Sequence, residues 1–133
     1  MTPETAQSIL EQAFAPWIRA LQPKITEIGV ERAVMVIPIT PEIERVGGIV
    51  SGQALAALAD TAMVFAIFGH LDAPEPVGTV TLDTQFLRPA SGEAIRAEAE
   101  VTRAGRAMIF ARCTLTAEPG GKAVAMATAT FAR

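Results

Sequence analysis

Asp60 is the side chain best placed for chemistry, because it stands in the middle of the apolar stretch Ala54 to Phe68. An ionised carboxylate among apolar side chains is unfavourable unless it is paired or hydrogen-bonded, and its pKa is then displaced. Such a group suits a general base or a nucleophile in a desolvated cleft. Buried ion pairs are also common, so an Asp60 that caps a neighbouring backbone or meets an arginine carries equal weight.

A glycine-rich segment precedes this stretch, with Gly47, Gly48 and Gly52 close together. Glycines let a ligand approach the backbone, and the free N–H groups at a helix start attract an anionic or polarised oxygen. On its own such a turn is more often only chain geometry. Followed two helical turns later by an acid, it predicts an oxyanion donor that faces a base.

The element that carries both features is a helix predicted over Gly52 to Phe68, with Ser51 as its N-cap and Gly69 at its end. Apolar spacing and turn residues predict one more helix, a long strand and four further strands along the chain. These elements are expected over Pro3 to Ile18, Thr26 to Thr40, Gly78 to Leu87, Ala94 to Arg103, Arg106 to Glu118 and Lys122 to Ala132.

A helix that is apolar on nearly all sides must be covered by other elements. The order of elements therefore predicts an α+β fold, in which a curved five-stranded antiparallel sheet wraps a long central helix. The helix at the N-terminus is an addition to this core. We expect one domain over residues 1–133, because the length is typical of a single domain.

Composition excludes several classes of function. The net charge of −3 gives no basic face for nucleic acid, and one cysteine and one histidine suit neither a disulfide framework nor a closed zinc site. The apolar stretch is too short for a membrane span and carries Asp60, and the N-terminus lacks the features of a signal peptide. We expect a cytoplasmic protein in which His70 and Cys113 are structural, while Trp17 packs the N-terminal helix or lines a pocket.

Three segments resemble a known family: GGIVSGQALAALADTAMVFAIFG, GTVTLDTQFLRPA and AEAEVTRAGR. They are similar to the hotdog-fold acyl-CoA thioesterases, most closely the phenylacetate-degradation type, over roughly residues 25–132. The resemblance implies that Asp60 is the catalytic acid and that the Gly52 N–H polarises the thioester carbonyl. The family's histidine and second glycine fall at Ser51 and Gln53, and its asparagine falls at Arg45. Ser51 could stand in through its hydroxyl or serve only as the N-cap, and Gln53 could point into the cleft or lie on the first turn.

The resemblance also implies a homodimer, or a dimer of dimers, with sites between subunits and no cofactor or metal. A hydroxyl at the start of the strand after the helix, Thr79 or Thr81, is then expected to approach the acid from the partner chain. Arg88, Arg103 and Arg106 lie where related proteins bind the phosphates of coenzyme A, although solvated strand ends are the commoner role for each.

The sequence therefore predicts hydrolysis of an acyl-CoA thioester, with Asp60 as base or nucleophile and Gly52 as oxyanion donor. The alternative is an acyl-CoA or fatty-acyl binding module without catalysis, because Ser51 and Arg45 replace the expected polar pair. A hydratase ranks last, since that chemistry needs a histidine near the acid.

Overall fold

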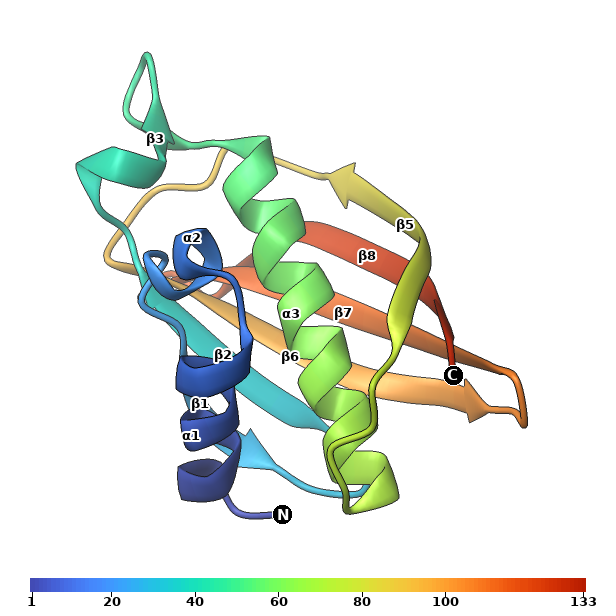
Figure 1. Ribbon diagram of the computed structural model, residues 1–133. Coiled ribbons are helices and arrows are strands. Elements are labelled where there is room, and N and C mark those ends of the chain that lie inside the picture. Colours follow the sequence, from blue (N-terminus) through green and yellow to red (C-terminus); the bar gives the residue numbers. More distant parts are fainter.

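The computed structural model describes all 133 residues. A long helix lies across a curved antiparallel sheet (Figure 1). In chain order the elements are α1 (Pro3–Ala13), α2 (Pro16–Arg19), β1 (Lys24–Ile28), β2 (Ala33–Pro38), a 3-10 turn (Pro41–Ile43), β3 (Glu44–Arg45), β4 (Ile49–Val50), α3 (Gly52–Leu71), β5 (Gly78–Phe86), β6 (Ala94–Ala104), β7 (Met108–Glu118) and β8 (Lys122–Ala132).

The main sheet has six strands in the order β1-β2-β6-β7-β8-β5, and every neighbouring pair is antiparallel. The prediction of five strands was wrong by one, because the expected strand Thr26 to Thr40 is a hairpin. The Gly29 N–H donates to the Arg32 carbonyl at 2.9 Å and reverses the chain there. The run from Val30 to Arg32 lacks the alternation of a half-buried strand, and all three residues are exposed.

Helix α3 covers the concave face of the sheet as predicted, and its buried residues form the core together with the inward-facing strand residues. Strand β8 turns the small side chains of Ala125, Ala127 and Ala129 toward the core, which lets the helix approach closely. The predicted N-cap is confirmed, since the Ala54 N–H donates to Ser51 Oγ at 3.3 Å. By length and composition this helix passes as a membrane span, but most of it is buried inside the fold.

Gly69 does not end the helix, which continues to Leu71 and stops where Asp72 adopts left-handed backbone angles. Its role is close packing instead. A Cβ atom at Gly69 would lie 2.5 Å from the Gly29 carbonyl oxygen, so only glycine lets the hairpin of β1 and β2 pass over the last turns of α3.

The N-terminal helix is shorter than predicted, because Pro16 interrupts it. Proline disfavours helical angles at the residue before it and has no N–H to donate, so α1 ends at Ala13 and a short α2 starts at Pro16. Phe14, between the two helices, stacks on Phe65 of α3 with ring centroids 5.1 Å apart. Trp17 is 62% exposed, so the packing role predicted for it belongs to Phe14.

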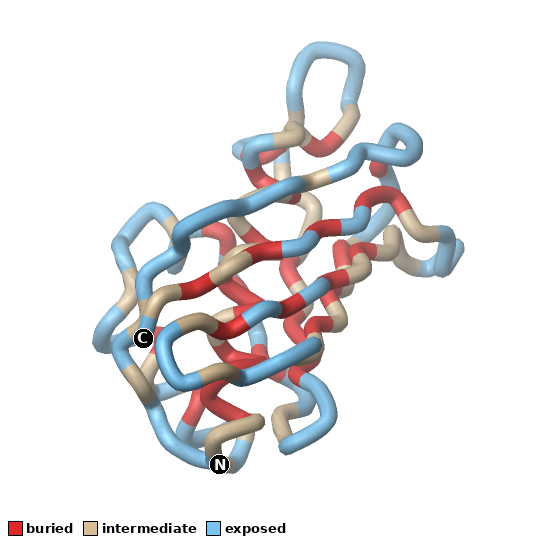
Figure 2. The backbone as a smooth tube through the Cα atoms, turned by 90° about the vertical axis from the view of Figure 1, so that its right-hand side faces the viewer, coloured by how far each residue is buried: buried red, intermediate tan, exposed pale blue.

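The two outer edges of the sheet differ. The outer edge of β1 is covered by α1, where the Gln7 side chain accepts from the Ile25 N–H at 2.9 Å and donates to the Pro23 carbonyl at 3.0 Å. The outer edge of β5 is covered by nothing, and Figure 2 shows this strand exposed along almost its whole length. Val80, Leu82 and Phe86 are large apolar side chains left exposed on it.

Candidate active site

Asp60 lies on the least buried stripe of α3, beside the start of β5. Thr79 Oγ1 donates a hydrogen bond to Asp60 Oδ1 at 2.9 Å. Burial raises the pKa of the Asp60 carboxyl, and the hydrogen bond from Thr79 lowers it by a smaller amount. No arginine pairs with Asp60 and it caps no backbone group, so of the two interpretations of this residue the structure favours a perturbed carboxyl poised for chemistry.

A β-bulge determines which threonine meets the acid. Thr79 pairs with Phe131 and Thr81 pairs with Thr130, so Val80 is an extra residue on β5. Residues that pair directly point to the same face, and Phe131 is fully buried on the helix side of the sheet. Thr79 therefore faces α3 while Thr81 faces outward with Thr130. Simple alternation would have put both threonines on one face.

The hydrogen bond between Thr79 and Asp60 forms within one chain. A hydroxyl from the partner subunit stays a prediction, while Thr79 of the same chain already donates to Asp60 Oδ1. Thr79 reaches Asp60 because β5 runs beside α3 in the same chain and begins next to the middle of the helix.

Gly52 is the first residue of α3, so its N–H is among those that the helix leaves without an internal partner. The ring of Phe86 lies over it, since a Cβ atom at this position would be 3.2 Å from Phe86 Cζ. Ser51 Oγ is engaged as the N-cap acceptor, and Gln53 is exposed on the first turn. The free backbone donor of Gly52 is thus the group at this end of the helix best placed to polarise a carbonyl.

A pocket of about 320 Å³ opens beside Gly52. The β3–β4 hairpin, the start of α3 and the segment after β5 form its walls: Arg45, Ile49, Val50, Gly52, Leu55, Phe86, Leu87, Arg88, Pro89 and Ala90. Phe86 lines this pocket, whereas Met63 and Phe65 are fully buried in the core. The place of Arg45 in the wall was not predictable, because the hairpin that carries it is too short to show a strand pattern.

The Gly52 N–H and the Asp60 carboxylate do not face each other within one chain. They are separated by two turns of an unbroken helix, which is about 12 Å along its axis. A reacting carbonyl must lie within about 3 Å of each group. One chain therefore supplies two half-sites rather than one complete site.

The three predicted phosphate-binding arginines are also distributed over the chain. Arg88 follows β5 and lines the pocket near Gly52. Arg103 and Arg106 are exposed at the β6–β7 turn, which adjoins the start of β5 because Met108 and Gly78 both pair with Ala132. Strand β5 spans about 25 Å between these ends, so within one chain the structure does not bring Arg88 to the other two.

Thr84 is a polar residue that sequence reasoning did not single out. It pairs with buried Ala127 and so faces the helix between Thr79 and Phe86, and its hydroxyl is buried without a hydrogen-bond partner. The alternation of the strand places Thr84 on the apolar face of β5 together with Phe86. This position was the feature of the sequence that could have identified it.

Two other titratable residues are structural, as predicted. His70 Nδ1 donates to the Val30 carbonyl at 3.2 Å and ties the end of α3 to the β1–β2 turn. Burial raises the pKa of the Cys113 thiol to about 12, which keeps it protonated and unreactive.

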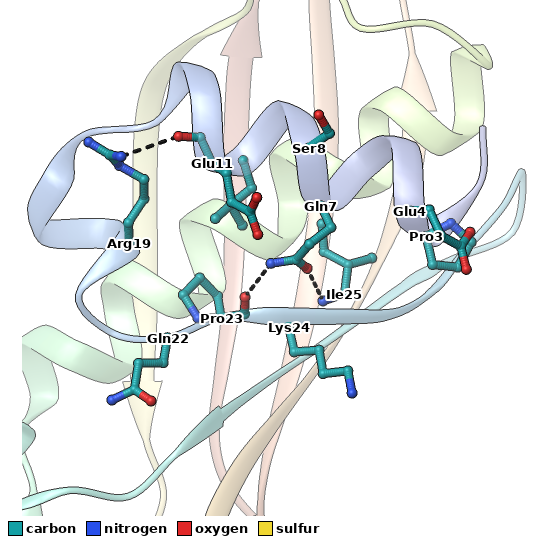
Figure 3. A pocket seen from close by; sticks show the side chains of 11 residues that line it. Pro3, Glu4, Gln7, Ser8, Glu11, Arg19, Gln22, Pro23, Lys24 and Ile25 are labelled. Carbon is teal, nitrogen blue, oxygen red and sulfur yellow. Dashed lines mark hydrogen bonds between the residues drawn. The ribbon is translucent and has the colours of Figure 1, made fainter.

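A larger cavity of about 640 Å³ lies elsewhere, between α1 and the segment from Arg19 to Ile25. Figure 3 shows Gln7 reaching across it to Pro23 and Ile25. None of the candidate catalytic residues lines this cavity. Its polar groups hold α1 against the edge of β1, so we assign it no part in the site.

Comparisons with known proteins agree with this architecture. A thioesterase family protein of Silicibacter pomeroyi is 25% identical with a TM-score of 0.85, covering 97% of this chain and 95% of that one. A variant of the phenylacetic acid degradation protein PaaI from Thermus thermophilus is 25% identical with a TM-score of 0.78, covering 90% and 99%. Zebrafish thioesterase superfamily member 2 shares the fold at 23% identity with a TM-score of 0.87, covering 99% and 98%. The comparison with curated proteins gave no match.

A long helix on a curved antiparallel sheet, with these structural relatives, defines a hotdog-fold protein, as the sequence predicted. Residues 47–124 match the thioesterase superfamily, and the chain belongs to that superfamily. The membership supports thioester hydrolysis as its general activity.

Proposed function

We propose that this protein hydrolyses acyl-CoA thioesters to the free acid and coenzyme A, with Asp60 as the catalytic carboxylate. The observation that carries the proposal is the environment of Asp60. It is a partly buried carboxyl with a raised pKa, and its hydrogen-bond partner is the Thr79 hydroxyl. A carboxyl in this state, in a chain of the thioesterase superfamily, suits a base or a nucleophile better than a structural role.

The reaction follows from two groups. The Asp60 carboxylate takes a proton from water, whose oxygen attacks the thioester carbonyl carbon, or it attacks that carbon itself and water cleaves the resulting anhydride. The carbonyl π electrons move onto oxygen, where the Gly52 N–H stabilises the negative charge. The tetrahedral intermediate collapses, the carbon–sulfur bond breaks, and the thiolate leaves and gains a proton.

Both groups reach one carbonyl only if two copies of the chain contribute, because one helix holds them about 12 Å apart. We propose a homodimer in which Gly52 of one subunit faces Asp60 of the other. The uncovered edge of β5, with its exposed Val80, Leu82 and Phe86, is the surface available for pairing. The opposite edge is closed by Gln7 and α1. We propose further that two such dimers form a tetramer. We also propose that the protein is cytoplasmic.

The remaining predicted residues have supporting roles in this proposal. Thr79 holds Asp60 in place, while Arg103 and Arg106 bind phosphates of coenzyme A at the β6–β7 turn. Ser51 acts as the helix cap that fixes the Gly52 N–H. The chemistry needs no cofactor or metal, since a carboxylate and a backbone donor supply both proton transfer and charge stabilisation.

The test is thiol release from a panel of short, medium, long and aryl acyl-CoAs. We expect turnover of at least one, loss of that turnover in Asp60→Asn, and its retention in Asp83→Asn, which changes an exposed carboxylate on β5. Circular dichroism confirms that each variant is folded. Absence of turnover over the whole panel would overturn the proposal.

A binding module without catalysis is the second candidate, because the Ser51 oxygen is committed to the helix cap and Arg45 stands where the family has asparagine. Tight binding of an acyl-CoA without thiol release, unchanged in Asp60→Asn, would favour that function.

A further inference from the structure

The pocket beside Gly52 has two unneutralised arginines in its wall. Arg45 comes from β3 and Arg88 from the segment after β5. Each donates from Nη1 to a backbone carbonyl, Arg45 to Val46 at 3.1 Å and Arg88 to Ala123 at 2.7 Å. A guanidinium has five N–H donors, so most of the donors of each remain free.

Four of the nine arginines in the chain are neutralised by carboxylates. Arg32, Arg96, Arg112 and Arg133 all form ion pairs. Arg45 and Arg88 form none. Arg45 and Arg88 both line the pocket, and an anionic group from outside the chain would find free donors on both guanidinium groups.

The rest of the pocket is apolar. Ile49, Val50, Leu55, Phe86 and Leu87 form most of the wall. Leu87 is 45% exposed, which leaves apolar surface for a ligand to cover. The volume of about 320 Å³ lies at the lower end of the range for small-molecule sites, which favours a short acyl chain.

We propose that this pocket binds the acyl group of the thioester, and that Arg45 and Arg88 hold an anionic group at its end, a terminal carboxylate. The protein would then prefer short ω-carboxyacyl thioesters over neutral ones. The inference rests on the proposed function, because it places the reacting carbonyl at the Gly52 N–H. It assigns Arg88 to the acyl group, whereas the sequence assigned this residue to coenzyme A.

Phosphates of coenzyme A are the other source of anionic oxygens in such a substrate. The geometry favours the acyl carboxylate, because both arginines line the same small cavity as Gly52. The extended pantetheine arm separates the phosphates from the thioester carbonyl by many bonds. A carboxylate at the end of a short acyl chain lies within the reach of this cavity.

The test compares adipoyl-CoA with hexanoyl-CoA, which have the same chain length and differ in the terminal carboxylate. We expect the wild-type protein to prefer adipoyl-CoA in kcat/KM by about tenfold to a hundredfold, the effect of one or two charge-assisted hydrogen bonds. Arg45→Met and Arg88→Met each lose most of this preference, and Arg45→Lys keeps part of it. Arg19→Met, an exposed arginine outside the pocket that also pairs with no carboxylate, keeps the wild-type preference.

A second arm uses N-acetylcysteamine thioesters of the same two acids, which lack every phosphate. Persistence of the preference on these thioesters supports the acyl carboxylate as the ligand. If instead Arg45→Met and Arg88→Met slow both acyl-CoAs equally and have no effect on the N-acetylcysteamine thioesters, the arginines bind phosphate and the proposal is overturned. No effect of either variant on any substrate overturns it as well.

Binding separates this proposal from the proposed function. Calorimetric titration of Asp60→Asn, in which hydrolysis is expected to be lost, with adipoyl-CoA and hexanoyl-CoA measures the same preference without turnover. Equal affinities for the two would overturn the carboxylate site even if hydrolysis by the wild-type protein is observed. Tighter binding of adipoyl-CoA in the absence of any hydrolysis by the wild-type protein would retain the site and overturn the catalytic proposal.

Discussion

The Thr79 hydroxyl donates to the Asp60 carboxylate at 2.9 Å inside a single chain, across the junction of β5 and α3. The bulge at Val80 makes this contact, because it turns Thr79 toward the helix and leaves Thr81 on the outer face. The carboxylate and the hydroxyl that orients it therefore move as one unit. In the proposed dimer the partner has to supply only the Gly52 donor.

Replacing Thr79 with valine is expected to shift the pH dependence of hydrolysis. The hydrogen bond from Thr79 favours the ionised form of Asp60 and lowers its pKa, so its loss raises that pKa further. Hydrolysis requires the ionised form, which exists above the pKa. The acidic limb of kcat/KM against pH therefore moves to higher pH in Thr79→Val. Thr81→Val, on the opposite face, serves as the control and leaves the limb in place; a limb unmoved in Thr79→Val would contradict the role assigned to Thr79.

Replacing Asp60 with asparagine is expected to stabilise the fold with a defined pH dependence. Because burial raises the pKa of Asp60 in the folded state, the native protein binds more protons than the unfolded chain between the two pKa values. Wild-type stability falls as pH rises through that window, starting near the unfolded value of about 3.9. Urea unfolding over a pH series should show that the free energy of unfolding of Asp60→Asn exceeds that of the wild type by an amount that increases with pH. This difference should reach a plateau above the pKa of Asp60 in the folded state. A gain that shrinks with rising pH would show that the carboxylate is stabilising.

Ser51 is expected to contribute to stability and not to catalysis. Its Oγ accepts from the Ala54 N–H at the start of α3, and loss of an N-cap costs about 1 kcal/mol. Ser51→Ala should lower Tm by roughly 3–5 °C for a chain of this size. Ser51→Asn retains a capping side chain and should restore most of the stability. A loss of kcat in both variants would instead identify the hydroxyl as part of the reaction.

The shared site predicts complementation between two inactive variants. Gly52→Pro removes the backbone donor at a helix position that tolerates proline, and Ser51 before it already has extended angles compatible with proline. Asp60→Asn removes the carboxylate. Subunits of the two variants, unfolded and refolded together, should form mixed dimers in which one of the two sites keeps both native groups.

Random pairing makes about half of the dimers mixed, so the mixture should recover about a quarter of wild-type activity. Each variant refolded alone is the control. If one chain held a complete site, mixing would restore nothing.

The apolar pattern of the sequence predicted α3, its cap and the four C-terminal strands, because each is long and strongly periodic. The misses fall at single residues. Pro16 divides the N-terminal helix, and the turn at Gly29 divides an expected strand. The apolar pattern continues beyond Pro16, whereas it is interrupted at Val30 to Arg32, where the alternation of a strand is lost.

The candidate site was predictable in its residue types and less so in its geometry. Asp60 stood out as a charge within an apolar helix, and the resemblance supplied the role of Gly52. The choice of Thr79 over Thr81 depends on one bulged residue, which leaves no mark in the alternation of side chains. The contribution of Arg45 depends on the fold of a short hairpin, which has no period to detect.

The difference between the two outer edges of the sheet also limits how many subunits can join by strand pairing. A subunit with two open edges could add copies on both sides and extend into a fibre, since strand pairing has no natural stopping point. In this chain the side chain of Gln7 binds the Ile25 N–H of β1 and the Pro23 carbonyl just before it, so α1 covers that edge against a further strand. Pairing through β5 consumes the open edge of both copies at once. One glutamine amide would thus limit edge-to-edge strand pairing to two subunits.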